Sequence, residues 1–268
     1  NTTAEANVAV GVNALMANTT GAYNVAVGMA ALDAATTATY NTVVGYNAGT
    51  TVTTGSYNTA LGGDTLKVNT TGAQNTALGM YALNANTTAS LNVAIGYTAL
   101  LVNTTGTANV AIGSYALDAN TTASNNTGVG YNALTTNTTG VNNTALGYLA
   151  GRDNTTGTYN TYIGSEAGLG SGTTSGGSNV AIGYASLYSI SSGGLNTGTG
   201  MWSLFSNTTG ANNVASGSYA MRYNTTGASN TAVGRSALEA NTTASNNTAV
   251  GYQAGTAVTT GAGNTFVG

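Results

Sequence analysis

The stretch NTALGMYALNANTTASL (residues 75–91) is followed at once by NVAIGYTALLVNTTGTA (residues 92–108), and both are variants of one seventeen-residue phrase. The same phrase recurs along the whole sequence, and a glycine closes its first five residues each time. The sixteen repeat glycines are Gly11, Gly28, Gly45, Gly62, Gly79, Gly96, Gly113, Gly130, Gly147, Gly164, Gly183, Gly200, Gly217, Gly234, Gly251 and Gly268. Fourteen of their fifteen intervals are 17 residues, and one is 19. A constant period over the whole sequence predicts one small structural unit stacked on itself.

A period of this length predicts an all-β fold, a parallel β-solenoid (β-roll) with about 17 residues per coil and roughly 15–16 coils. Residues 1–268 are expected to form a single elongated domain, because no proline, linker or change in composition marks a boundary. The 19-residue interval places a two-residue insertion near 169–172. Its sequence, Leu169-Gly170-Ser171-Gly172, predicts an exposed glycine-rich bulge.

We number the positions of each coil from the repeat glycine as position 0. Position −3 is Thr or Val in all sixteen coils, and position −1 is Val, Leu or Ile in fourteen. Side chains alternate along a strand, so these two positions share one face, which we expect to line the interior. Position +4 is Leu in ten of fifteen coils and is expected to supply a second buried column. The four coils with Gly at +4 are expected to have a thinner core and to be locally less stable.

Three further positions have restricted residue types. Position −2 is Ala in eleven of sixteen coils. If −3 and −1 face the interior, −2 faces outward, and its small side chains would permit another chain to approach closely. Position −4 is Asn in every coil. Its side-chain amides could hydrogen-bond to one another between coils as a ladder, or each could hydrogen-bond to nearby backbone groups as a turn residue. We expect the repeat glycine to adopt a conformation that a Cβ would obstruct. Position +10, Gly or Ala throughout, is expected to require only a small residue.

Charged residues are rare, with seven acids and four cations giving a net charge of −3. The cations, Lys67, Arg152, Arg222 and Arg235, are too few to neutralise a stretch of phosphates, so we expect no nucleic-acid partner. No apolar run approaches the roughly 18 residues of a membrane helix, so we expect no membrane insertion. Position +5 accepts either sign of charge and is therefore expected to face water. The charged residues at +5 are Asp33, Lys67, Asp118, Arg152, Arg222 and Glu239.

The composition also restricts the chemistry. With no His and no Cys, the chain lacks imidazole bases, thiol nucleophiles and the usual ligands of transition metals. We therefore expect no catalytic, cofactor-binding or metal site, and a protein that is not an enzyme. The best carboxylate pair for polysaccharide cleavage is Asp153 with Glu166, at +6 and +2 of successive coils, and the alternative is that both are solvated surface charges.

Aromatic residues supply candidate binding surfaces. Tyr23, Tyr40 and Tyr57 share position −5 in three consecutive coils and predict an aromatic ladder, which could stack on sugar rings or simply pack ring on ring. Trp202 and Phe205 lie close together in sequence and predict a local apolar patch suited to adhesion.

The phrase Asn-Thr-Thr occurs eleven times, and each copy is an acceptor sequence for N-glycosylation. Its asparagines are Asn1, Asn18, Asn69, Asn86, Asn103, Asn120, Asn137, Asn154, Asn207, Asn224 and Asn241. The alternative is a structural role, because the hydroxyl pair persists where the Asn is lost, as in Ala35-Thr36-Thr37.

The stretch NTGVGYNALTTNTTG (residues 126–140) resembles the repeats of bacterial and phage tail-fibre proteins, which often end in a self-cleaving chaperone domain of the endosialidase type. The phrase Asn-Val-Ala-Ile-Gly, at 92–96, 109–113 and 179–183, is similar to the head repeats of trimeric autotransporter adhesins, although the adhesin repeat is shorter. The resemblance implies a parallel β-roll assembled as a homotrimer.

These features predict a structural fibre or filament segment of an extracellular, cell-surface or virion appendage. We expect self-association as a homotrimer, as an end-to-end filament because both ends are ordinary coils, or as both, with surface glycans as candidate partners. An ice-binding β-solenoid is the alternative, since the paired hydroxyls at −9 and −8 could form regular columns. Adjacent residues of a strand point to opposite sides, which would leave only one such column exposed. A polysaccharide depolymerase is a third and weaker alternative.

Overall fold

The computed structural model describes residues 3–268, which form sixteen three-residue strands and no helix. None of the described residues therefore belongs to a helix able to cross a membrane. The chain divides into two compact units, Asn1–Tyr131 and Asn132–Gly268, and each is described by itself. The prediction of one single domain concerns the relation between these units and stays a prediction.

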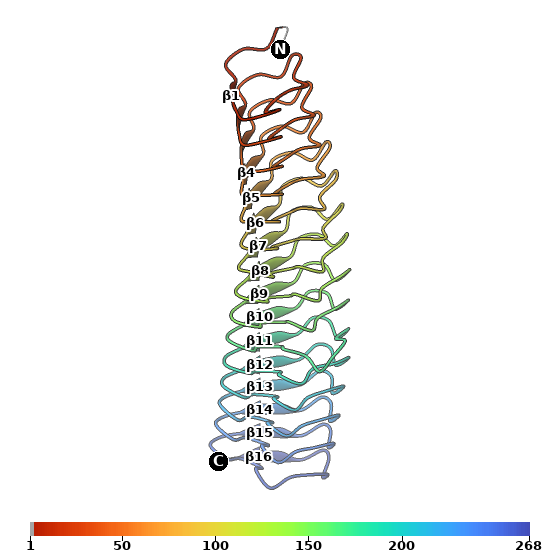
Figure 1. Ribbon diagram of the computed structural model, residues 1–268. Coiled ribbons are helices and arrows are strands. Elements are labelled where there is room, and N and C mark those ends of the chain that lie inside the picture. The colour runs from red at the N-terminus through yellow and green to blue at the C-terminus, as the bar shows by residue number, and fades with distance from the viewer. Residues whose placement is uncertain (1–2) are drawn as a thin grey trace. The chain divides into compact units, whose positions relative to one another are not determined.

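In the first unit the strands pair in parallel and in sequence order, each displaced from the next by one repeat (Figure 1). The pairs Val8↔Val25 and Val25↔Thr42 show this register. The strands are β1 (Val8–Val10), β2 (Val25–Val27), β3 (Thr42–Val44), β4 (Thr59–Leu61), β5 (Thr76–Leu78), β6 (Val93–Ile95), β7 (Val110–Ile112) and β8 (Thr127–Val129).

The second unit repeats this arrangement. Its strands are β9 (Thr144–Leu146), β10 (Thr161–Ile163), β11 (Val180–Ile182), β12 (Thr197–Thr199), β13 (Val214–Ser216), β14 (Thr231–Val233), β15 (Thr248–Val250) and β16 (Thr265–Val267). The pairing of β10 with β11 spans 19 residues, as in Thr161↔Val180, because the insertion lies between these two strands. The predicted parallel β-solenoid with about 17 residues per coil is therefore confirmed.

Backbone hydrogen bonds join neighbouring coils on every side, well beyond the short strands. At position +4, after the strand, the N–H of Leu83 donates to the carbonyl of Ala99 in the next coil at 3.0 Å. In the turn of the Asn-Thr-Thr phrase, the N–H of Thr70 donates to the carbonyl of Thr87 in the next coil at 2.8 Å. Gln74 N–H donates to the carbonyl of Ser56 in the preceding coil at 3.0 Å. Each coil thus supplies hydrogen-bond partners to the backbone groups of its neighbours, which explains why strands of only three residues are enough to hold the coils together.

The assignment of positions −3 and −1 to the interior is wrong, and the two faces of the strand are reversed. At −2, Ala60 is 1% exposed, whereas Leu61 at −1 is 52% exposed and Thr59 at −3 is also exposed. The Ala column at −2 is therefore part of the core and is not available as a contact between chains. The predicted Leu column at +4 is confirmed, and it is buried in Leu32, Leu66, Leu83, Leu100, Leu117, Leu134, Leu187, Leu204 and Leu238.

Size explains the reversal. The interior of a seventeen-residue coil is narrow, and the Leu at +4 projects into it from the side opposite the strand. Facing that Leu, there is room only for Ala at −2 and for the small buried residue at +3, such as Ala82 or Ala99. The larger Val, Ile and Leu side chains at −1 cannot fit into the same space and therefore lie outside.

The four coils with Gly at +4 are not thinner, because larger residues at −2 fill the space. A Cβ added to Gly151 would lie 2.6 Å from Cδ2 of Tyr162, and one added to Gly255 would lie 2.6 Å from Cδ2 of Phe266. Tyr162 also covers the corresponding site on Gly168. Large residues at −2 and glycine at +4 therefore compensate each other in volume, so the expected thinning is wrong, and the expected weakness of these coils stays a prediction.

Three positions per coil adopt left-handed backbone conformations. Positions −5, +2 and +4 have positive φ in the described coils, as in Tyr40 (57°), Asn47 (51°) and Leu83 (50°). Such values are uncommon for residues other than glycine and cost on the order of 1 kcal/mol each. Burial of the +4 side chain and the bonds between coils offset this cost. Gly is therefore acceptable at +4 for its conformation as well as for its size.

The repeat glycine has the conformation that the sequence predicts. Its φ lies between 122° and 146° in all sixteen coils. A Cβ on Gly62 would also lie 2.8 Å from the carbonyl oxygen of Gly79 in the next coil. Glycine is required because both its backbone angle and its distance to the neighbouring coil exclude a side chain.

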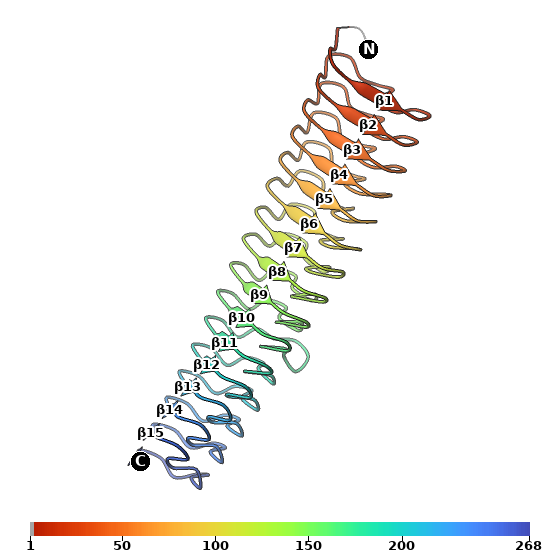
Figure 2. The ribbon, with the colours of Figure 1, turned by 90° about the vertical axis from the view of Figure 1, so that its left-hand side faces the viewer.

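The insertion widens the loop between β10 and β11, which extends farther than the equivalent loops beside it (Figure 2). Ser171 and Gly172 are exposed, as predicted, whereas Leu169 is only 4% exposed and Gly170 is buried. The bulge therefore begins after Gly170.

Candidate functional site

No pocket is found in the part of the chain that the structure describes, so the candidate sites are surfaces. Likewise, residues 3–268 contain no group of three or more His, Cys, Asp or Glu side chains that could hold a metal ion.

The first candidate surface is the outer face of the sheet, formed by positions −3 and −1 in each unit. We call it the outer sheet face. Its −1 column is Val10, Val27, Val44, Leu61, Leu78, Ile95, Ile112 and Val129 in the first unit, and Leu146, Ile163, Ile182, Thr199, Ser216, Val233, Val250 and Val267 in the second. Its −3 column is Val or Thr throughout. Exposed fractions of 48% for Leu146 and 41% for Ile182 are high for such apolar side chains.

None of the eleven charged residues in the printed sequence lies at −3, −2 or −1, so the outer sheet face carries no charge of its own. In-register pairing repeats each column at the spacing of neighbouring parallel strands, about 4.8 Å. The two columns lie two residues apart on the strand, about 6.7 Å. The face is therefore narrow, regular and uncharged, with a mostly apolar −1 column beside a −3 column that is Thr in ten of sixteen coils.

Asparagine side chains bind the backbone from inside the coil, at −4 in every coil and also at +7 in the coils that carry the Asn-Thr-Thr phrase. Asn58 at −4 and Asn69 at +7 both donate through Nδ2 to the carbonyl of Gly72, at 3.0 and 2.9 Å. The backbone N–H of Asn75 donates to Oδ1 of Asn58 in the preceding coil at 3.0 Å, and Nδ2 of Asn86 donates to Oδ1 of Asn69 at 2.8 Å. The ladder role and the backbone-satisfying role predicted as alternatives for position −4 are thus performed by one side chain.

The same hydrogen bonds place every described asparagine of the Asn-Thr-Thr phrase in the interior. Asn18 is 3% exposed and the other nine are fully buried, and their Nδ2 atoms donate inside the coil, as at Gly72. A glycan attached to that nitrogen would have no room and would break these bonds. N-glycosylation is therefore incompatible with this fold at Asn18, Asn69, Asn86, Asn103, Asn120, Asn137, Asn154, Asn207, Asn224 and Asn241. Asn1 lies outside the described residues.

The two threonines that follow have different environments. Thr70, at −9, donates its hydroxyl to the carbonyl of Thr87 at 3.1 Å and is half-buried. Thr71, at −8, is exposed. Only the −8 residue of this pair is therefore fully exposed. The two residues lie in a bend and not in a strand, so alternation along a strand is not the cause of this difference.

The predicted tyrosine ladder is present in the first unit. The ring centroids of Tyr23 and Tyr40 are 4.8 Å apart and those of Tyr40 and Tyr57 are 5.1 Å apart, with nearly parallel planes. All three side chains are at least half exposed. The rings cover each other's faces, so the ladder presents ring edges and hydroxyls to solvent and offers little ring face for a sugar.

A second aromatic surface, in the second unit, is richer than the predicted Trp202–Phe205 patch. We call it the arginine–aromatic cluster, and its members are Trp202, Tyr219, Arg222, Tyr223, Arg235 and Tyr252. The guanidinium carbon of Arg222 lies 4.6 Å from the Trp202 ring centroid, 5.3 Å from that of Tyr219 and 5.0 Å from that of Tyr223. Phe205 lies beside Trp202 at 6.3 Å, edge to face. The sequence pattern missed the arginines because they lie one and two coils away.

Arg235 extends the cluster along the stack. Its guanidinium carbon lies 5.6 Å from the Tyr219 ring and 5.7 Å from the Tyr252 ring, and its Nη1 donates to the Tyr252 hydroxyl at 3.3 Å. Tyr252 is 61% exposed and Tyr223 is 45% exposed, so part of this aromatic surface is open to solvent.

The charged residues at +5 are half-buried, so they reach water, as predicted, with only part of each side chain. Burial raises the pKa of Asp118 above its ordinary value, and no other cause contributes. Arg152 donates two hydrogen bonds to Asp153, at 2.7 and 2.8 Å, and this pairing raises the pKa of Arg152. The Asp153 carboxylate predicted as a partner of Glu166 is therefore occupied by Arg152.

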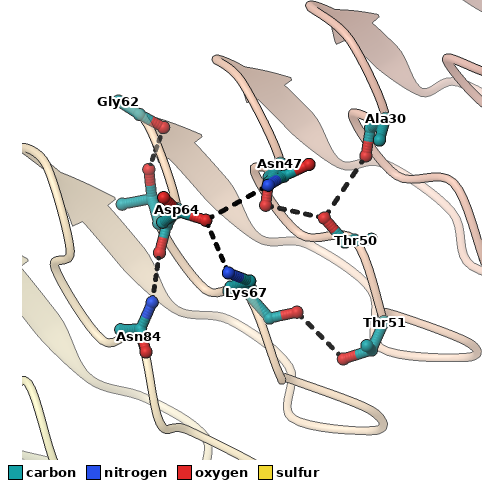
Figure 3. A network of polar contacts seen from close by, with 9 residues as sticks. Ala30, Asn47, Thr50, Thr51, Gly62, Asp64, Lys67 and Asn84 are labelled. Carbon is teal, nitrogen blue, oxygen red and sulfur yellow. Dashed lines mark hydrogen bonds and ion pairs between the residues drawn. The ribbon is translucent and has the colours of Figure 1, made fainter.

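A polar cluster in the first unit surrounds Asp64 (Figure 3). Lys67 Nζ lies 2.9 Å from Asp64 Oδ1, and Asn47 Nδ2 donates to the same oxygen at 3.4 Å. The hydrogen bond and the charge of Asp64 raise the pKa of Lys67. Asn84 donates to the Asp64 carbonyl at 2.8 Å. These contacts connect three successive coils, which indicates a structural role.

Comparison with protein-family models finds no match, and no curated protein sequence matches the chain.

Proposed function

We propose that this chain is a structural segment of an extracellular fibre that assembles as a parallel homotrimer through its outer sheet face. The observation that carries the proposal is the exposure of the −3 and −1 columns, for example Leu61 at 52% and Leu146 at 48%. Rows of exposed apolar side chains of this extent are typical of surfaces that another molecule covers.

A second copy of the same chain fits this face better than an unrelated partner. Its columns have the same spacing, so copies related by an axis parallel to the columns bring every side chain against its equivalent. The absence of charge at −3 and −1 removes like-charge repulsion between copies. The narrow face allows three copies to converge on one axis, and the resemblance to tail-fibre and trimeric adhesin repeats favours three over two.

The trimer contact predicted at position −2 is replaced in this proposal by the opposite face of the same strand. The mechanical role follows from the hydrogen bonds between coils, which run along every side of each unit. Such a segment would hold a tip or an anchor at a fixed distance, in a cell-surface or virion appendage.

The test is the molar mass in solution by light scattering coupled to size-exclusion chromatography. The wild type should have three times the chain mass of 26.2 kDa. The double variant Leu61→Glu/Leu146→Glu places a charge on the outer sheet face of each unit and should give single chains. The matched control, Thr71→Glu/Thr156→Glu, alters exposed residues of the same coils at −8 and should remain trimeric. A wild type that runs as a single chain would overturn the proposal.

The outer sheet face also favours one second candidate, an ice-binding surface. Thr42, Thr59 and Thr76 follow one another at −3, beside Val or Leu at −1, and so present hydroxyls and methyls in two regular columns. The same face cannot serve both functions. A single-chain wild type with thermal hysteresis that the Leu61→Glu/Leu146→Glu variant abolishes would establish this candidate.

A further inference from the structure

The arginine–aromatic cluster has an unusual charge environment for this chain. Among the described residues, Lys67 and Arg152 each form an ion pair with a neighbouring carboxylate. Arg222 and Arg235, the other two cations, form none in the part of the chain that the structure describes. Both lie instead against aromatic rings, which hold a guanidinium in place without neutralising it.

One acidic residue lies in a coil that contributes to the cluster. Glu239 occupies position +5 of the coil that follows Arg222, and its carboxylate lies beyond ion-pair distance of the described cations. Its backbone carbonyl, and not its side chain, contacts the cluster, by accepting the N–H of Tyr223 at 3.1 Å. The surface therefore combines two guanidiniums without carboxylate partners with one nearby negative charge.

We propose that the arginine–aromatic cluster binds an acidic polysaccharide. A guanidinium offers paired donors that match a carboxylate, and the exposed rings of Tyr223 and Tyr252 can stack on sugar rings. The cluster spans positions in four successive coils, so it forms a track that suits a chain of sugars. In the tyrosine ladder, by contrast, the middle ring, Tyr40, is stacked between Tyr23 and Tyr57 and has no face left for a sugar.

An acidic polysaccharide fits better than a nucleic acid. The chain has a net charge of −3, and two free guanidiniums cannot offset the dense charge of a phosphate backbone. A polysaccharide with one carboxylate on each sugar or on alternate sugars carries less charge and exposes more apolar ring surface. The cluster lies at +1, +2, +5 and +6, off the outer sheet face, so binding does not depend on the proposed trimer.

The test is isothermal titration calorimetry of the full chain with hexagalacturonate and with oligosialic acid, compared with neutral maltohexaose and a thymidine hexanucleotide. We expect at least one acidic oligosaccharide to bind, maltohexaose not to bind, and affinity to fall as salt increases. Arg222→Ala should weaken binding about tenfold or more, because it removes a charge-assisted contact.

The matched control is Lys67→Ala, which changes the net charge equally but lies in the other unit and should bind as the wild type does. Glu239→Gln should strengthen binding about twofold or more by removing the nearby negative charge. Circular dichroism of each variant checks that the fold persists. Failure of both acidic probes, equal binding of maltohexaose, or tighter binding of the hexanucleotide would each overturn the proposal.

Discussion

At the repeat glycine, the lack of space for a single atom, Cβ, determines which residue the coil accepts. Its φ near 130° disfavours any side chain, and a Cβ would meet the backbone of the next coil. The neighbouring residue provides the contrast, because a Cβ on Gly63 would have only the Tyr46 carbonyl oxygen within 4 Å, at 3.9 Å.

We therefore expect Gly62→Ala to destabilise the chain by about 3 kcal/mol or more, and Gly63→Ala to change stability by less than about 0.5 kcal/mol. Chemical denaturation followed by circular dichroism measures both variants. Equal midpoints for the two would contradict the close approach of the coils at Gly62.

Tyr162 has a fully buried hydroxyl without a hydrogen-bond partner in the described structure, and burial raises its pKa far above the ordinary value. Tyr162→Phe keeps the ring that fills the space beside Gly151 and Gly168 but removes this unsatisfied group. We expect a gain of about 1 kcal/mol. The control Tyr159→Phe alters a side chain that is 63% exposed and should be neutral. A loss of stability in Tyr162→Phe would show that the hydroxyl has a partner.

Asp118 should make stability depend on pH. Burial raises its folded-state pKa, so the unfolded chain releases this proton at a lower pH than the folded chain does. Its contribution therefore falls as pH rises from the unfolded pKa to the folded pKa. We expect Asp118→Asn to be more stable than the wild type at neutral pH and the difference to vanish at a pH low enough to protonate both states. A stability difference between the two proteins that stays constant as the pH falls would contradict this account.

At the scale of the coil, periodicity was sufficient to predict the stacking, the Leu column at +4 and the glycine bend. It was not sufficient to predict which face of the strand is buried. Val at −1 is more hydrophobic than Ala at −2, and only the width of the coil, set by Leu at +4, makes Ala the residue that fits. The left-handed conformations at −5, +2 and +4 also had no signal, because Tyr, Asn and Leu all occupy them.

Some of the candidate sites could be predicted from the sequence and others could not. Tyr23, Tyr40 and Tyr57 share one position, so their stacking could be predicted from spacing alone. The arginine–aromatic cluster mixes four positions of successive coils, and the spacing of no single column reveals it. Of the two roles that the sequence left open for the Asn-Thr-Thr phrase, the burial of Asn69 and its equivalents favours the structural one. A sequon describes only local sequence, whereas this burial depends on the coil closing around the asparagine.

The asparagine columns should contribute strongly to each coil. Asn196 accepts the N–H of Asn213 at 3.1 Å and donates to the carbonyl of Gly210 at 2.8 Å. Asn196→Ala leaves the buried N–H of Asn213 without this acceptor, and we expect a loss of about 1–3 kcal/mol. Thr209→Ala, an exposed residue of the same coil, should cost less than about 0.5 kcal/mol. A neutral Asn196→Ala would show that the ladder is dispensable.

At the scale of the whole molecule, function depends on what the outward surfaces contact. The proposed trimer uses the outer sheet face, and the proposed polysaccharide site uses a different set of positions in the second unit. The two proposals can therefore fail independently. A fibre whose outer sheet faces hold three chains together and whose turns bind acidic sugars would combine mechanical strength with adhesion.

The most direct test uses the adjacent valines Val43 and Val44, because the chain contains no cysteine. Val43 is fully buried at −2, and Val44 lies on the outer sheet face at −1. We predict that Val44→Cys chains become linked to one another by disulfides on mild oxidation. Val43→Cys should form no disulfide between chains and should resist thiol reagents until it is denatured. A native Val43→Cys that reacts rapidly, or a Val44→Cys that stays unlinked, would contradict this account.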